Sequence, residues 1–201
     1  MHKPPLLALA ALVAGTSLIV AGTTGSASGR FKQGGSLRVN LPVTDIDDID
    51  PSLAYGSVSW HIEYSTALKL LNYPDAAAPR GSPLRPEGAS SVTISRDGRR
   101  YTFRIRKGFS FSDGTKVTAR NYAFAINRAL GKDLQSPAFQ FIADSNGVNI
   151  VGAQAVRDGT APNASGVRVR RNKLIIRLAK PDGSFLAKIA TPFFQAMPTN
   201  L

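Results

Sequence analysis

The sequence lacks several of the residues on which protein chemistry most often depends. It contains no cysteine, which excludes disulfides, thiol nucleophiles and every zinc or iron–sulfur site built on cysteine. Its two histidines are His2 and His61, so a site made of several histidines is excluded. A Ser-His-Asp triad would have to use His61. We therefore expect neither a cofactor nor a metal.

Acidic residues are also scarce. The chain has 13 Asp and Glu against 25 Lys and Arg, a net charge of +12. Such an excess is typical of proteins that meet an anionic partner, such as nucleic acid or a membrane surface. The same excess arises when arginine residues lie on solvent-exposed faces without any anionic partner. The hydrophobic share of 43% over 201 residues is sufficient for one domain with its own core.

The N-terminus has the three regions of an export signal. A short basic start is followed by an apolar run over residues 6–21 and by small residues up to Ala27. This pattern predicts a signal peptide over residues 1–27. The alternative is a retained membrane anchor, but the run is shorter than the about 20 apolar residues that a spanning helix needs. Residues 20–22 resemble the start of a lipobox, and Thr23 occupies the place of its cysteine, so we expect no lipid anchor.

The first elements after this segment are a strand, an acidic loop and a helix. Residues 36–41 alternate apolar and polar side chains, which predicts a strand. The acidic loop over residues 45–51 invites a calcium interpretation, but it lacks the Gly and Glu of an EF-hand loop. A helix is expected from Ser57 or Ser59 to Leu71.

Hairpins and short helices alternate through the rest of the chain. Asp97-Gly98 predicts a tight turn between strands at residues 89–95 and 100–107, and Thr118 and Gly131 bound a predicted amphipathic helix. Further expected elements are helices at residues 150–157 and 183–190, a hairpin of residues 167–170 and 174–179, and a tail at 191–201 with unpartnered Phe193 and Phe194. This order predicts an α+β fold with mainly antiparallel pairing.

One stretch, residues 84–130, resembles the characteristic block of family 5 of the bacterial solute-binding proteins, the peptide/nickel-binding proteins of ABC importers. The matching positions are Asp97-Gly98, Tyr101-Thr102-Phe103, Phe111-Ser112-Asp113-Gly114 and Thr118-Ala119. Other short motifs continue in family order from Gly34 onward. The sequence departs from the family at Arg120-Asn121, where two acidic residues are usual.

The resemblance implies a type II periplasmic-binding-protein-like fold. It implies that residues 28–201 are the N-terminal part of a solute-binding domain, truncated before the rest of its two lobes. Residues 36–50 would be a lobe-one strand and loop, 51–185 a small inserted α+β domain, and 186–201 a return toward lobe one. The implied partners are a peptide or other small solute and ABC transporter permease subunits. We expect no nucleic acid partner, no integral membrane anchor after cleavage, and a periplasmic or extracellular location.

The candidate substrate-binding residues are Tyr55, Gly56, Ser57 and Trp60. They follow the acidic loop, where the resemblance places the chain along the ligand cleft. Exposed glycine backbone and serine can hydrogen-bond a peptide main chain, and the two aromatic rings offer flat apolar contact. The alternative is that Trp60 belongs to the core and Tyr55 only packs against it.

Two other functions are weighed against binding for import. The first is an exported polyanion- or cell-wall-binding protein, because basic residues gather on both predicted hairpins and would form one patch if their polar faces adjoin. The alternative there is two separate solvated faces. The second is an enzyme, but Ser59, His61 and Glu63 are spaced so that a helix scatters them. No nucleophile elbow, P-loop or HExxH motif is present, so we expect no catalysis.

Overall fold

The computed structural model describes residues 34–36, 38–40, 46–143 and 149–201. The predicted signal peptide, Thr23 and the start of the acidic loop lie outside these ranges. The chain divides into two units, residues 1–40 and 41–201. In the first unit, residues 34–36 and 38–40 form neither helix nor strand. The strand predicted over residues 36–41 is therefore not observed in its described part, because alternation of side chains makes no strand without a hydrogen-bonded neighbour.

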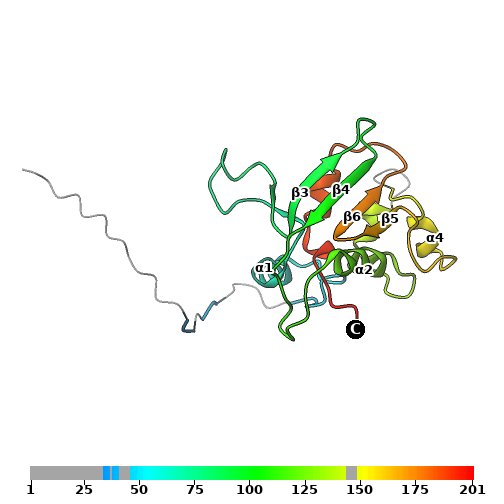
Figure 1. The fold of residues 1–201 in the computed structure, drawn as a ribbon. Coiled ribbons are helices and arrows are strands. Elements are labelled where there is room, and N and C mark those ends of the chain that lie inside the picture. Colours follow the sequence, from blue (N-terminus) through cyan, green and yellow to red (C-terminus); the bar gives the residue numbers. More distant parts are fainter. Residues whose placement is uncertain (1–33, 37, 41–45, 144–148) are drawn as a thin grey trace, which may run out of the picture. The chain divides into compact units, whose positions relative to one another are not determined.

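The second unit is built on a four-stranded antiparallel sheet (Figure 1). The spatial order is β3-β4-β6-β5, and β4 pairs directly with β6. Both predicted hairpins thus form and join into one sheet. The turn between the first two strands contains Gly98 at φ +65°, a conformation that glycine adopts without strain. The strand bounds are β3 (Ala89–Ile94), β4 (Arg100–Ile105), β5 (Val167–Arg170) and β6 (Lys173–Arg177).

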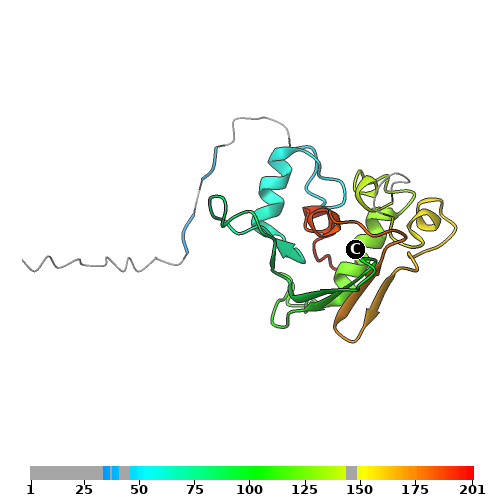
Figure 2. The same cartoon turned by 90° about the horizontal axis from the view of Figure 1, so that it is seen from above.

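One face of this sheet carries the core. Tyr101, Phe103 and Ile105 of β4 are buried, and Leu174 and Ile176 of β6 continue the same face. The helix α2 (Ala119–Leu130) packs against β5 and β6, and the C-terminal helices lie on the same side of the sheet (Figure 2). On the opposite face, which we call the open face, Arg100 and Arg104 of β4 are exposed and Thr102 is half-buried. This arrangement confirms the predicted alternation of apolar and polar residues along β4.

Both predicted ends of α2 are confirmed. The Thr118 hydroxyl accepts a hydrogen bond from the Arg120 amide, and the Asn121 side chain accepts one from the Thr118 amide at 2.9 Å. This reciprocal pair is a capping box, with asparagine at the position usually held by Glu or Gln. Gly131 follows the last helical residue.

The helix α1 (Ser57–Thr66) ends before the predicted Leu71. The backbone carbonyl of Leu70 instead accepts hydrogen bonds from the amides of Glu87 and Ala89, both at 3.1 Å. Leu71 then pairs with Pro86 between two short strands, β1 (Leu71–Asn72) and β2 (Arg85–Pro86). Pairing with a distant segment thus overrides the helical pattern of the leucines.

Short helices complete the unit, and they correct the prediction for the tail. Phe193 and Phe194 are not unpartnered: both are fully buried, and their short helix packs against α1 and α2. Within the described residues, no helix is long and apolar enough to cross a membrane. The short helices are α3 (Phe139–Ile142), α4 (Ala153–Arg157), α5 (Phe185–Ile189) and the 3-10 helix η1 (Pro192–Phe194).

Candidate functional site

The four predicted ligand-binding residues lie together at the start of α1. Tyr55 is 54% exposed, whereas Trp60 is partly buried and its indole Nε1 donates a 2.8 Å hydrogen bond to the Ala54 carbonyl. Both rings meet Phe193, with centroid distances of 6.0 Å from Tyr55 and 5.4 Å from Trp60. Trp60 thus anchors to the core, as the alternative reading required, and Tyr55 presents a ring to solvent above it.

The Asp47 carboxylate holds the backbone at the start of α1. Asp47 accepts hydrogen bonds from the amides of Tyr55 at 2.7 Å and Gly56 at 2.6 Å, and also from the Ser59 hydroxyl. The bond from Ser59, followed by the amide bonds, holds the pKa of Asp47 far below its usual range. A Cβ at position 56 would lie 2.9 Å from the Asp47 carboxylate, so this close approach favours glycine.

The hydrogen-bonding capacity that remains for a ligand is smaller than the sequence suggested. The Gly56 amide is engaged by Asp47, and the Gly56 carbonyl accepts from the Trp60 amide at 3.0 Å. The exposed groups are the Tyr55 side chain and Ser57. Gly56 therefore contributes shape at this site, while Tyr55 and Ser57 offer contact.

The inner face of α1 carries a second buried polar contact. The Glu63 carboxylate accepts a hydrogen bond from the Gln195 amide, and both side chains are buried. Burial raises the pKa of Glu63 even though the bond from Gln195 acts in the opposite direction. This pair joins α1 to the C-terminal segment two residues after Phe193.

The residues weighed for catalysis do not assemble. Ser59 and Glu63 are buried, whereas His61 is exposed on the other side of α1. The Ser59 hydroxyl donates to Asp47 and not to an imidazole.

The acidic loop serves internal structure. Asp47 holds the start of α1, Asp48 accepts from the Asp50 amide at 2.8 Å, and Asp50 pairs with Arg128. Among the described residues, no group of three or more His, Cys, Asp or Glu side chains is placed to hold a metal ion.

Sequence reasoning missed Asp47 and Phe193 as parts of this site. Asp47 lies in the acidic loop, and no local sequence pattern marks it as a partner of α1. Phe193 is separated from Trp60 by most of the chain. Only the packing of η1 against α1 brings the two rings together.

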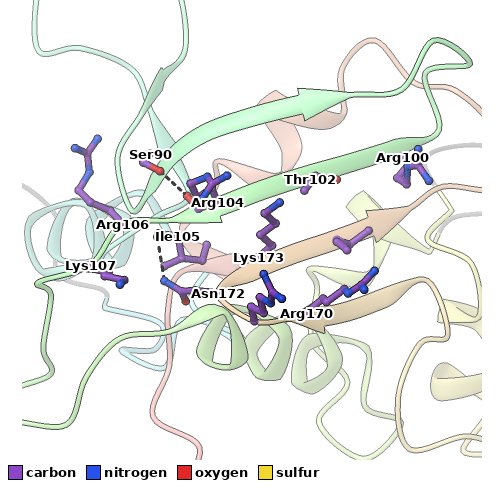
Figure 3. Close-up of a pocket in the computed structure, with 12 residues that line it drawn as sticks. Ser90, Arg100, Thr102, Arg104, Ile105, Arg106, Lys107, Arg170, Asn172 and Lys173 are labelled. Atoms are coloured by element: carbon purple, nitrogen blue, oxygen red, sulfur yellow. Dashed lines mark hydrogen bonds between the residues drawn. The ribbon is translucent and has the colours of Figure 1, made fainter.

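A second surface feature lies over the open face of the sheet. The polar faces of the two hairpins adjoin, because β4 pairs with β6. They border an open groove of about 820 Å³ (Figure 3). We call this feature the basic groove; its lining includes Arg100, Arg104, Arg106, Arg170, Arg171 and Lys173.

Known proteins share both the sequence and the fold of this chain. Oligopeptide-binding protein OppA of Bacillus subtilis (strain 168) is 29% identical over 184 residues, covering 89% of this chain and 31% of that protein. Periplasmic murein peptide-binding protein MppA of Escherichia coli (strain K12) is 34% identical over 117 residues, covering 57% and 21%. The structure of the Escherichia coli murein tripeptide binding protein MppA matches with a TM-score of 0.65 at 29% identity, over 75% of this chain and 28% of that one.

These relatives are named as peptide-binding proteins. The chain spans about a third of their length or less. The likeness confirms the predicted α+β fold of periplasmic peptide-binding proteins. The profile of the bacterial extracellular solute-binding proteins, family 5 Middle, matches residues 83–200. The chain therefore belongs to the bacterial extracellular solute-binding proteins of family 5.

Proposed function

We propose that this chain is part of the extracytoplasmic substrate-binding component of an ABC-type importer, and that its solute is a peptide. The observation that carries the proposal is family membership together with relatives named for oligopeptides and murein peptides. In this proposal, ABC transporter permease subunits are its partners and the predicted signal peptide directs it to the periplasm or the cell exterior.

The aromatic cluster at the start of α1, formed by Tyr55, Trp60 and Phe193, supports the proposal that the peptide binds there. Tyr55 offers an exposed ring that is backed by Phe193, and Trp60 stands edge-on to both rings. Because Trp60 and Phe193 are anchored in the core, Tyr55 has a rigid support, which lowers the entropy lost on ligand contact. We propose that Tyr55 and Ser57 touch the peptide, while Gly56 and Trp60 shape the surface.

The division of the chain follows the family resemblance in this proposal. Residues 36–50 belong to lobe one, 51–185 to the small inserted domain, and 186–201 lead back toward lobe one. Because the chain spans about a third of OppA, we propose that it supplies only part of the peptide site. Its own affinity for peptides should then be weaker than micromolar.

Trp60 provides a direct test, because it is the single tryptophan of the chain. The intrinsic fluorescence of the chain is titrated with tripeptides and longer peptides at constant ionic strength. We expect a saturable change with a millimolar midpoint, and Tyr55→Ala should abolish it.

Tyr73→Ala is the matched control. Tyr73 is 44% exposed, compared with 54% for Tyr55, and lies outside the aromatic cluster. It should leave the titration unchanged. A fluorescence response that survives Tyr55→Ala, or no response to any peptide, would contradict the proposed site, and a micromolar midpoint would contradict the partial-site interpretation.

A further inference from the structure

The basic groove brings like charges into direct register across three strands. On the open face, Arg104 of β4 lies opposite Lys173 of β6, which in turn lies opposite Arg170 of β5. Figure 3 shows Lys173 between the two arginines. Since neighbouring strands lie about 4.8 Å apart, the row spans roughly 10 Å. A second like pair, Arg100 opposite Arg177, continues the positive face along the sheet.

This arrangement works against the stability of the sheet. Like charges directly opposite each other on one face of a strand pair are destabilising. None of the ion pairs found among the described residues includes Arg104, Lys173 or Arg170. The described residues that line the groove include no Asp and no Glu. The repulsion is therefore not relieved within this part of the chain, and an anion seated in the groove would relieve it.

The shape and chemistry of the groove define the kind of anion. Arginine forks donate paired hydrogen bonds to phosphate oxygens, and Arg104 and Arg170 flank the shorter Lys173. The row of three cations is only roughly 10 Å across, which suits one flexible chain better than a nucleic acid duplex or a flat bilayer surface. The described residues of its lining include no aromatic side chain, whereas binders of single-stranded nucleic acid stack bases on aromatic rings.

The positive surface is longer than the groove itself. Arg100 also lines a neighbouring depression of about 380 Å³ with Arg96 and Arg177, in which Arg99 is paired with Asp97. Arg100 and Arg106 are six residues apart on and just beyond β4, which corresponds to about 20 Å of extended chain. A linear polymer could therefore contact several cations in succession, in contrast to a single small anion.

We propose that the basic groove is a second binding site, separate from the aromatic cluster, for a single-chain phosphate polymer whose repeating unit carries no aromatic base. The site does not depend on the proposed peptide function, because none of its residues belongs to the cluster at Tyr55. Asn172 fixes one end of the groove by donating a 3.0 Å hydrogen bond to the Ile105 carbonyl. The cations of β4 and β6 are thereby presented on a rigid sheet.

The test measures binding of the full chain to end-labelled inorganic polyphosphate by fluorescence anisotropy over a series of salt concentrations. A second arm uses poly(glycerol phosphate), which separates chains linked by pyrophosphate bonds from phosphodiester chains. The combined variant Arg104→Gln, Arg170→Gln, Lys173→Gln should weaken binding at least ~10-fold. Its slope of log affinity against log salt should fall by about 2, since each lost contact on a flexible single chain removes roughly 0.7.

A variant of equal net charge controls for the overall charge of the chain. Arg80→Gln, Arg120→Gln, Lys132→Gln changes three exposed cations outside the groove, and its slope should fall by less than about 0.7. Thermal melts establish that both variants are folded. Equal losses in the two variants would overturn the site, since the binding would then reflect net charge alone. Tighter binding to oligodeoxythymidylate, or to phosphatidylglycerol vesicles, than to either polymer would overturn the assigned ligand class.

Discussion

Arg128 of α2 donates two hydrogen bonds to the carboxylate of Asp50, from Nη1 at 2.7 Å and from Nη2 at 2.5 Å. Burial by itself would raise the pKa of Asp50, but the bonds from Arg128 and from the Ser52 amide outweigh it and lower the pKa. The pair ties the acidic loop, which precedes α1, to the last turns of α2. It thereby sets the position from which the chain enters the Tyr55 segment.

Replacing Asp50 by Asn should destabilise the chain by about 1–2 kcal/mol at pH 7. The lost contact is charge-assisted and bidentate, and its partial exposure reduces its contribution below that of a buried pair. Because the folded pKa is depressed, the contribution is present above the unfolded pKa near 3.8 and is lost as pH falls through the folded value. Urea denaturation at pH 7 and pH 3 measures both effects. The exposed Asp75→Asn serves as control, and an equal effect of that change at pH 7 would contradict the prediction.

Glu63 should give the opposite dependence on pH. Burial raises the folded pKa of Glu63 above its usual value of 4.5, so the folded state binds the proton more tightly than the unfolded state. Its contribution is fully present below about pH 4.5 and is lost as pH rises through the folded pKa. Glu63→Gln should therefore gain stability relative to the unchanged chain as pH rises from 4 to 8. A difference in urea midpoint that stays constant across this range would argue against the raised pKa.

The family usually has two acidic residues where this chain has Arg120 and Asn121, and the structure explains the asparagine. Asn121 Oδ1 accepts from the Thr118 amide, while Nδ2 donates a buried 2.9 Å hydrogen bond to the Met197 carbonyl. A carboxylate keeps the first contact and loses the second. Asn121→Asp should thus cost about 1–3 kcal/mol, the effect of leaving a buried acceptor unsatisfied.

The neighbouring position supplies the comparison for Asn121. Arg120 is exposed in the first turn of α2, where an acidic side chain interacts favourably with the helix dipole. Arg120→Asp should raise the free energy of unfolding by about 0.3–1 kcal/mol. Chemical denaturation measures the free energy of unfolding of both variants. If Asn121→Asp stabilises the chain, the assigned role of the Asn121 side-chain amide is wrong.

The features that sequence predicted well are those specified by residues close together in the chain. The Asp97-Gly98 turn, the Thr118 cap and the end of α2 at Gly131 each depend on a few neighbouring residues, and all three are confirmed. The helix α1 ends earlier than its sequence pattern predicts, because Leu70 and Leu71 pair with residues 86–89. Phe193 was missed for the same physical reason, since its partners lie far away in sequence.

The same distinction between local and long-range features holds for the candidate site. Tyr55, Gly56, Ser57 and Trp60 are neighbours in sequence, so a resemblance to known motifs could select them together. Two contacts could be found only from the tertiary structure: Phe193 stacks on Tyr55, and the Gly56 amide donates a hydrogen bond to Asp47. The joining of the two basic hairpins was open at the level of sequence, and the pairing of β4 with β6 decides it.

Phe193 should be the aromatic residue on which the cluster depends most. It is fully buried and meets the rings of Tyr55, Trp60 and Phe141. Phe193→Ala should cost about 3–5 kcal/mol and shift the emission of Trp60 to longer wavelength, because water reaches the indole when the ring is removed. Phe109→Ala removes a ring that is 37% exposed and should cost far less. Similar losses for the two variants would show that Phe193 is not a central packing residue.

The row of like charges in the basic groove leads to a prediction on stability that is independent of ligand binding. Lys173→Glu would place a carboxylate opposite Arg104 on one side and Arg170 on the other. Two repulsive cross-strand pairs become attractive, each contributing roughly 0.2–1 kcal/mol, so the chain should become more stable by about 1 kcal/mol. Lys180→Glu makes the same change of net charge at an exposed position outside the sheet and should stay within about 0.5 kcal/mol of the unchanged chain. Urea denaturation at low ionic strength compares the free energies of unfolding of the two variants, and the gain from Lys173→Glu should shrink in high salt.

If Lys173→Glu destabilises the chain or has the same effect as Lys180→Glu, the cations of the groove do not repel one another as their register implies. If it stabilises the chain while polyphosphate binding is lost, then the positive row lowers stability in exchange for binding, the relation expected of a functional surface.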